Sequence, residues 1–225
     1  MDNQKSKIWI SRSIDNWREK ILQRTGLEEY NFFKNRKDRL VIFGMYRPED
    51  WLIFRFHRGP KIVQWCGSDI LATGLNARWM QKIPARHICE NEVEQGVLRL
   101  LLQQEVEVQT IFLSDPDKYP ISYKYSPTPH VWMHINIRAE LESGWKLIEE
   151  VASQVPKVTF HIFGRTKAIP MAKNIEMHGF VPEYYLDEAI KHYQAGLRLH
   201  EFDGSSEVIM KSILMGQYPI SRIRY

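Results

Sequence analysis

A polar loop near the C-terminus is the part of the sequence best suited to chemistry. It reads HEFDGSSE over residues 200–207 and precedes a segment with helical spacing. Ser205 and Ser206 stand where that helix should begin, and the free amides of a first helical turn bind anions such as phosphate. Asp203 would lie at the carboxyl end of the preceding strand, where open α/β sheets bind ligands. The same pattern also occurs in capped surface helices that bind nothing.

Cys66, His87 and Cys89 are the other candidates for chemistry, because strand ends could bring them together around a metal. No C-x-x-C pair or second cluster accompanies them, although structural zinc sites normally show such spacing. Buried strand residues are the better interpretation, so we predict no metal. The dinucleotide-binding glycine fingerprint, the P-loop and the G-x-S-x-G elbow are absent from the sequence. We therefore predict no bound cofactor.

Short apolar runs alternate with amphipathic segments along most of the chain. The runs predict strands buried on both faces, at residues 7–10, 40–43, 61–65, 86–89, 108–113, 131–135, 158–163, 175–177, 196–199 and 218–221. Helical spacing predicts helices over 140–153, 182–194 and 206–215. Repetition of strand, helix and strand indicates parallel sheets with right-handed crossovers, and so an α/β protein.

The pattern breaks once, between residues 114 and 130. This stretch holds four prolines, and proline fixes φ and removes a backbone donor, which favours an extended linker. We therefore predict a Rossmann-like domain over residues 1–118, a linker over 119–129 and a second Rossmann-like domain over 130–225.

Composition limits the class of protein. Of 225 residues, 44% are hydrophobic and 26% are charged, which is typical of a globular protein and argues against disorder. No apolar run approaches the roughly 20 residues of a membrane helix, and the N-terminus lacks a signal-peptide pattern. Two cysteines are too few for a disulfide scaffold. We therefore predict a cytoplasmic protein.

The charge balance is mildly basic. A formal charge of +4 suits a protein that holds an anionic ligand. The isoelectric point near 9.0 and the basic run over residues 34–39 raise the alternative of nucleic-acid binding. That run also contains Asp38 and is more simply a solvated loop, so we predict no nucleic-acid partner.

Residues 195–221 resemble the donor-binding segment of retaining GT-B glycosyltransferases, whose E-x7-E motif has an acidic residue, a Gly, a helix and a second Glu. Asp203 and Gly204 match the first part of the motif. Lys211 stands where the second Glu would be, with seven residues between. In the family the first acid contacts the transferred sugar and the second binds the ribose hydroxyls. The departure matters, because an ammonium group can donate a hydrogen bond but cannot accept one.

Further matches occur along the same half of the chain, and each fills one position of the family's donor domain. Arg138 matches a loop Arg that is aimed at the pyrophosphate, and a guanidinium can bridge its oxygens; Ser143 stands where the family has a Lys. Gly164 ends the next strand. Gly179, Phe180 and Val181 match a turn that borders the nucleobase, and Gly216 and Pro219 match the end of the E-x7-E segment with one extra residue between them.

The first half of the chain carries a thinner resemblance. Residues 67–70, GSDI, match an acceptor-domain segment of some members, with Cys66 where His would be. Asp69 could orient an acceptor hydroxyl, or it could cap a helix. His57 and Arg58 are weaker candidates for the same region.

By this resemblance the chain would have two Rossmann-like domains whose parallel sheets face a cleft, and it would move a sugar from a nucleotide-sugar donor to an acceptor hydroxyl. The anomeric configuration would be retained without a metal, because cations and helix dipoles would stabilise the leaving diphosphate. The catalytic residues would be Asp69, Arg138 and Asp203. The donor-binding residues would be Arg138, Gly164, Gly179, Phe180, Val181, Asp203, Gly204, Ser205, Ser206 and Lys211.

The partners would be the donor and an unidentified sugar, lipid or protein acceptor, and the chain could contact a membrane peripherally; the oligomeric state stays open. The altered positions Ser143 and Lys211 favour a non-catalytic GT-B-like binding module as the alternative. The family's donor domain continues past the strand at 218–221, so we expect a small or C-terminally truncated member.

Overall fold

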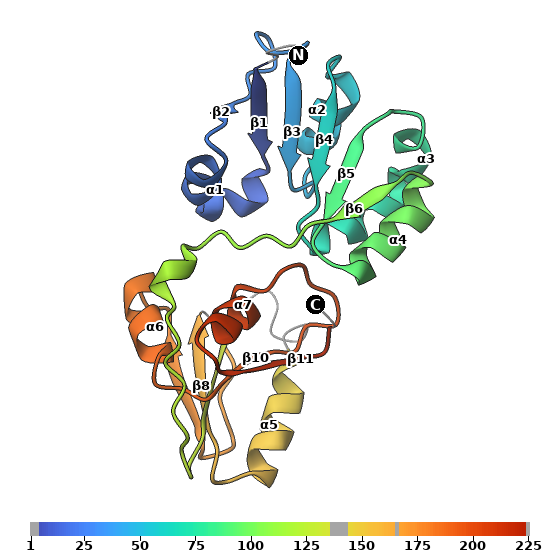
Figure 1. The fold of residues 1–225 in the computed structure, drawn as a ribbon. Helices are drawn as coiled ribbons and strands as arrows, with labels where there is room; N and C mark the ends of the chain where they lie inside the picture. The colour runs from blue at the N-terminus through green and yellow to red at the C-terminus, as the bar shows by residue number, and fades with distance from the viewer. Residues whose placement is uncertain (1–4, 136–143, 165–166, 224–225) are drawn as a thin grey trace. The chain divides into compact units, whose positions relative to one another are not determined.

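The computed structural model describes residues 5–135, 144–164 and 167–223, and its elements are labelled in Figure 1. Contacts along the chain divide it into two compact units. Unit 1 comprises the residues up to Leu113 together with Phe202–Ser205, and unit 2 comprises Ser114–Glu201 and Ser206–Ile223. Each unit contains one parallel sheet, so the predicted α/β class with two parallel sheets is confirmed. Among the described residues, no helix is long and apolar enough to cross a bilayer.

Unit 1 is built on a six-stranded sheet in the order β2-β1-β3-β4-β5-β6, in which every pair is parallel. Its strands are β1 (Ser6–Ile10), β2 (Glu28–Glu29), β3 (Arg39–Phe43), β4 (Lys61–Gln64), β5 (Arg86–Cys89) and β6 (Val106–Val108). Its helices are α1 (Arg18–Thr25), α2 (Pro48–Phe56), α3 (Ala77–Met80) and α4 (Glu92–Leu102), with 3-10 segments at Arg12–Trp17 and Ser68–Leu75. Apolar strand residues such as Leu40, Ile42 and Val63 are fully buried, as expected for strands covered on both faces.

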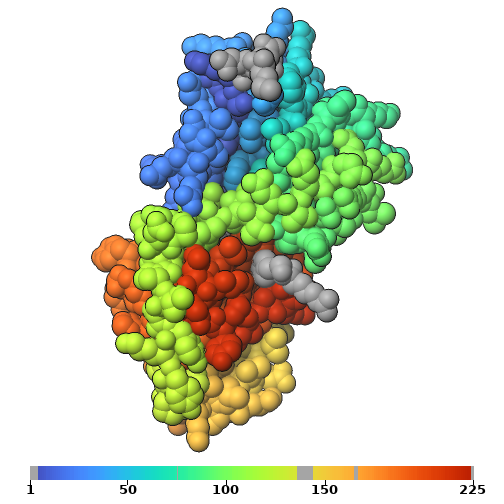
Figure 2. All heavy atoms as spheres, viewed as in Figure 1, coloured from blue at the N-terminus to red at the C-terminus, as the bar shows by residue number. Residues whose placement is uncertain are grey.

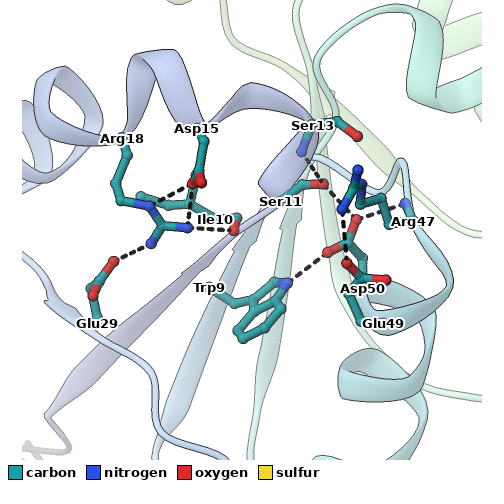
Figure 3. Close-up of polar contacts among 10 residues, drawn as sticks. All are labelled: Trp9, Ile10, Ser11, Ser13, Asp15, Arg18, Glu29, Arg47, Glu49 and Asp50. Carbon is teal, nitrogen blue, oxygen red and sulfur yellow. Dashed lines mark hydrogen bonds and ion pairs between the residues drawn. The ribbon is translucent and has the colours of Figure 1, made fainter.

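One buried carboxylate ties the start of unit 1 to helix α2. Asp50, in the first turn of α2, is 0% exposed and accepts hydrogen bonds from Trp9 Nε1 at 2.7 Å and Ser11 Oγ at 2.6 Å (Figure 3). Its Oδ2 also accepts from the backbone amide of Arg47 at 2.8 Å. A buried charge is tolerated only when its lone pairs are matched in this way. The bonds from Trp9 and Ser11 fix α2 against the end of β1, and the bond from Arg47 caps the helix itself.

Unit 2 is built on a five-stranded parallel sheet in the order β11-β10-β7-β8-β9. Its strands are β7 (His130–Ile135), β8 (Thr159–Gly164), β9 (Ile175–Gly179), β10 (Ala195–Arg198) and β11 (Tyr218–Ser221), and its helices are α5 (Trp145–Gln154), α6 (Glu183–Ile190) and α7 (Glu207–Leu214). Alternate residues of the strands pack with α5 in one apolar cluster that includes Met133, Ile162 and Ile148. Because side chains alternate between faces, the remaining strand residues, histidines among them, belong to the other face.

The proline-rich stretch runs over the surface of unit 2, as the yellow-green spheres in Figure 2 show. Apart from a 3-10 turn at Pro116–Lys118, it has no regular structure. Tyr119 is only 2% exposed and donates to Asp187 Oδ2 at 3.0 Å. The amides of Ser122 and Tyr123 donate to the carbonyl of Met215. The stretch predicted as a linker is therefore extended, but its contacts make it part of unit 2.

The predicted elements correspond closely to the observed ones. Most predicted strands are present with ends shifted by one or two residues, but the run predicted over 108–113 corresponds to β6, which ends at Val108. Just after β6 the amide of Gln109 still donates to the carbonyl of Cys89, and the amide of Ile111 then donates to Ser205 Oγ. Helices α1 to α4 were not among the predicted elements, and α5 begins at Trp145, with the predicted residues 140–143 outside the described range.

Gly164 closes β8 against the end of β7. Its φ is +100°, and a Cβ at this position would lie 2.1 Å from the carbonyl oxygen of Ile135. No side chain fits there without moving the backbone of β7. Gly179, which ends β9, also has a positive φ of +68°, but a Cβ there would meet no described atom within 4 Å.

These two glycines give a matched test of the close approach. Gly164→Ala should lower the free energy of unfolding by more than about 2 kcal/mol, since it combines a left-handed φ with a backbone clash. Gly179→Ala should cost only about 1 kcal/mol, since only the φ is unfavourable. Urea unfolding of both variants measures the difference, and equal losses would contradict the strand contact.

Candidate functional site

A cavity of about 200 Å³ lies in unit 2 at the carboxyl ends of its strands. It is lined by His134, Phe163, Gly164, Phe180, Val181, Glu183 and Leu186. The first three belong to the ends of β7 and β8, the next two follow β9, and the last two lie on α6. This edge of a parallel sheet is where open α/β folds bind ligands. We call this cavity the unit-2 pocket.

Three residues predicted to bind the donor meet in the unit-2 pocket. Gly164, Phe180 and Val181 come from two segments that are separated by more than a dozen residues in the sequence. Phe180 is 69% exposed, so its ring offers an apolar surface at the pocket. Gly179 ends β9 immediately before it, and its left-handed φ turns the chain toward α6.

His134 is a pocket residue that the sequence analysis missed. Burial lowers the pKa of His134, and the positive charges of Arg198 and Lys211 lower it further. The imidazole is therefore neutral near pH 7 and can either donate or accept a hydrogen bond. The sequence could have indicated His134 as a site residue, because it lies near the carboxyl end of a predicted strand and alternates with the apolar residues of that strand.

Lys211 lies beside this pocket in a group of carboxylates. It is 5% exposed, and its Nζ lies 2.9 Å from Asp187 Oδ1 and 3.9 Å from both Glu183 and Glu207. Its ammonium also lies over the ring of Tyr119. Burial alone would lower the pKa of Lys211, but hydrogen bonds to Tyr119 and Asp187 outweigh it and raise the pKa. Lys211 thus joins α7, α6 and the extended stretch.

The predicted anion site is arranged differently from the expectation. Asp203, Gly204 and Ser205 belong to unit 1, whereas Ser206, at the start of α7, belongs to unit 2. Asn91 Nδ2 donates to the carbonyl of Asp203 at 2.9 Å, and the amide of Ser205 donates to Glu90 Oε2 at 2.6 Å. The Ser205 amide, predicted to receive phosphate, therefore already has an acidic acceptor.

Gly204 allows the backbone of Asp203–Ser205 to approach the Glu90 side chain closely. A Cβ at Gly204 would lie 1.8 Å from Glu90 Oε2. Glu90 is buried, and burial raises the pKa of its carboxyl well above the ordinary value. The Asp203–Ser205 backbone thus packs directly on a buried acidic side chain of unit 1.

Asp69 holds the loop after β4. It is 0% exposed, and its carboxylate accepts from the amides of Met45 at 2.9 Å and Cys66 at 3.0 Å. Burial raises the pKa of Asp69 to about 7 in spite of these bonds. The Asp69 side chain is thus buried and bonded to backbone amides, and its contact with an acceptor stays a prediction.

The other sequence candidates have separate surroundings or lie beyond the description. Arg138 and Ser143 are outside the described residues. His57 is buried, with Tyr30 Oη at 3.0 Å from its Nδ1. His87 Nδ1 lies 3.3 Å from Trp65 Nε1, and Cys89 Sγ donates to the carbonyl of Asn91. These side chains thus have protein partners of their own.

Glu94, on α4, is a further buried acidic residue close to Glu90. Glu94 is 0% exposed; its Oε2 accepts from the amide of Glu90 at 2.8 Å, while its Oε1 has no hydrogen-bond partner among the described residues. Burial raises the pKa of Glu94 to about 8. The raised pKa favours the protonated form of this carboxyl near neutral pH.

Lys211→Met tests whether Lys211 holds unit 2 together. Removing the ammonium leaves the Asp187 carboxylate without its ion-pair partner at a partly buried site, so the free energy of unfolding should fall by about 3 kcal/mol. The surface ion pair of Lys191 with Glu188 is the control, and Lys191→Met should change stability by less than about 1 kcal/mol. Adding Asp187→Asn to Lys211→Met should restore part of the loss. Equal effects of the two lysine variants in urea unfolding would refute this role.

Glu94→Gln tests the raised pKa. Because the folded pKa of about 8 exceeds the ordinary 4.5, the native state holds an extra proton between these pH values. The contribution of Glu94 to stability is then full below pH 4.5 and is lost as pH rises toward 8. Glu94→Gln should resemble wild type near pH 5 and become relatively more stable by pH 8.5. A stability difference that does not change with pH would contradict a protonated Glu94.

No protein-family model matches the sequence, and no curated protein matches it. Solved structures do resemble it. HepE from Anabaena, in complex with UDP-glucose, has a TM-score of 0.62 at 11% identity, over 90% of this chain and 69% of HepE. The pneumococcal O-GlcNAc transferase GtfA, in complex with UDP and GlcNAc, has a TM-score of 0.58 at 13% identity, over 92% of this chain and 45% of GtfA.

TarM gives a third similarity, with a TM-score of 0.57 at 11% identity over 83% of this chain. This chain spans 41% of TarM and 45% of GtfA, so it corresponds to less than half of either protein. Identities this low describe the fold and leave the activity open. The chain has an α/β fold with two parallel sheets that matches the GT-B-like fold of glycosyltransferases.

Proposed function

We propose that this protein is a glycosyltransferase that uses a nucleotide-sugar donor, and that the unit-2 pocket binds the donor's nucleotide. The observation that supports this most is the meeting of Gly164, Phe180 and Val181 around one cavity at the carboxyl ends of β7 and β8. The family resemblance assigned these same residues to donor binding. The GT-B-like fold supports the same class of reaction.

The pocket is suited to part of the donor. Its volume of about 200 Å³ is below the roughly 300–1,000 Å³ of cavities that enclose drug-sized ligands, so it would take the nucleoside end. Phe180 would stack on the base, and backbone groups of the turn after β9 would face the edge of the base. HepE and GtfA were solved with UDP-glucose and with UDP, which makes UDP-sugars the first donors to test.

Glu183 would replace the acid that the motif lacks. Lys211 occupies the position of the family's second Glu, and it is held by carboxylates. Glu183 lines the pocket and lies 3.9 Å from Lys211. Its carboxylate can accept hydrogen bonds from ribose hydroxyls, which an ammonium group cannot do. The acidic function would thus come from α6 and not from α7.

Catalysis would depend on stabilising the leaving diphosphate, without a metal and with retention of configuration. We propose that Arg138 contacts the diphosphate and that Asp203 contacts the transferred sugar, as the resemblance implies. The positive charge of Arg198 near His134 would add a favourable potential for an anion at the pocket. The acceptor would be a hydroxyl of a sugar, lipid or protein.

A binding module without transfer is the second candidate, and two contacts favour it. The Ser205 amide donates to Glu90, and Lys211 is paired with Asp187. Both positions serve the donor in the resembling family. Binding of a nucleotide sugar without turnover would select this candidate.

Titration calorimetry with UDP-glucose, UDP-GlcNAc, UDP-galactose, GDP-mannose and ADP-glucose tests the proposal, together with sugar-release and transfer assays. Phe180→Ala should weaken binding roughly 5- to 100-fold, the range for loss of base stacking. Glu183→Gln should weaken binding about tenfold, through lost charge-assisted bonds to ribose.

Glu188→Gln is the matched control, because Glu188 lies on the same helix, is exposed and pairs with Lys191. It should bind the donor like wild type. Failure of every nucleotide sugar to bind or to raise the melting temperature at millimolar concentration would refute the donor site.

A further inference from the structure

Three histidines form a chain across strands β7, β8 and β9 of unit 2. His130 Nδ1 lies 2.7 Å from His161 Nε2, and His161 Nδ1 lies 2.9 Å from His178 Nε2. Glu176 adds a carboxylate, with its Oε2 at 3.3 Å from His161 Nδ1 and 4.0 Å from His178 Nε2. We call these four residues the histidine cluster. The sequence analysis assigned none of them a role.

The register of the sheet brings these side chains to one face. His161 is the direct partner of Glu176 across β8 and β9, and Glu176 and His178 are two residues apart, so both project from the same face. His130 stands two residues before Trp132, the partner of His161 on β7. The pairing of β8 with β9 shifts after Ile162, so that Phe163 pairs with Gly179 and His178 is passed over. Such a bulge can re-aim a side chain.

From this geometry we propose that His161 Nδ1, His178 Nε2 and Glu176 Oε2 bind a Zn²⁺ ion. The three atoms form a triangle with edges of 2.9, 3.3 and 4.0 Å. Zinc bonds of about 2.0–2.1 Å in tetrahedral geometry separate ligand atoms by roughly 3.3 Å. Small side-chain rotations would therefore bring all three atoms into the coordination sphere, and water would take the fourth position.

Burial, ring stacking and hydrogen bonds hold the histidines of the cluster in place. His161 is 5% exposed, and the Tyr193 ring stacks on it at 4.3 Å between centroids. With zinc on Nδ1, the Nε2–H of His161 donates to His130 Nδ1, which is the outer hydrogen bond that fixes a zinc-bound imidazole. His178 stacks on Phe163 at 4.5 Å, and its side chain stays partly accessible, so an ion can enter from that side.

The ligand types select the metal. Two imidazoles and one carboxylate suit zinc, whereas magnesium and calcium prefer oxygen ligands alone. Zinc here would tie β8 to β9 at their bulge. Phe163 both stacks on His178 and lines the unit-2 pocket, so the ion would stiffen one wall of that pocket. The zinc site does not depend on the proposed function, because its ligands lie outside the residues assigned to the donor.

The test is zinc binding by chelator-treated, untagged protein, measured by titration calorimetry with ZnCl₂ and by the visible absorption of Co²⁺ in its place. We expect one ion per chain, a dissociation constant of about 1 μM or tighter and a higher melting temperature with zinc. His178→Ala and Glu176→Gln should each weaken binding at least tenfold. His130→Gln should weaken it about 10- to 100-fold, as loss of an outer hydrogen bond does.

The exposed His192→Ala is the matched control, because it removes an imidazole of the same unit outside the histidine cluster, and its zinc affinity should equal that of wild type. Three outcomes would overturn the proposal. They are a dissociation constant weaker than about 1 mM, unchanged affinity in His178→Ala, and a Co²⁺ spectrum of octahedral type. The histidines would then form only a hydrogen-bonded chain.

Discussion

The ion pair between Lys211 and Asp187 is the contact on which the functional end of unit 2 depends. The Lys211 ammonium is buried beside three carboxylates and lies over the Tyr119 ring. It fixes the position of α6, which supplies Glu183 and Leu186 to the unit-2 pocket. It also fixes the extended stretch, because Tyr119 donates to the other oxygen of Asp187. A buried charge requires such partners, so the pocket wall and the stretch are set together.

In unit 1 the buried groups that require hydrogen-bond partners are carboxyl groups. Asp50 and Asp69 are buried and accept two or more hydrogen bonds each, several of them from backbone amides. Glu94 Oε1 has no hydrogen-bond partner among the described residues, and burial raises the pKa of this carboxyl, which favours its protonated form. Glu90 accepts from the amide of Ser205, so a buried acid sets the path of the Asp203 loop. The acids of unit 1 therefore shape loops through their need for donors.

The histidine cluster and the unit-2 pocket occupy one face of the same sheet. The apolar cluster with α5 uses the alternate strand positions, which leaves His130, His134 and His161 for the other face. Phe163 separates the two groups, since it stacks on His178 and lines the pocket. Alternate positions of each strand thus serve different purposes: one set packs in the apolar core, and the other set supplies the polar side chains of the histidine cluster and the pocket.

Sequence periodicity by itself determined the parallel α/β class and the positions of most strands. These features are local: a short apolar run requires burial on both faces, and a strand end requires a turn. The family resemblance, carried by short motifs, pointed to Gly164, Phe180 and Val181, which line the pocket. Only the tertiary structure decided that Asp69 faces inward, that the Ser205 amide has Glu90 as its acceptor, and that Lys211 pairs with Asp187. It alone joined His130, His161 and His178. Partners such as Glu90 and Ser205 are far apart in sequence, and strand register with helix packing, not local spacing, brings them within hydrogen-bond distance.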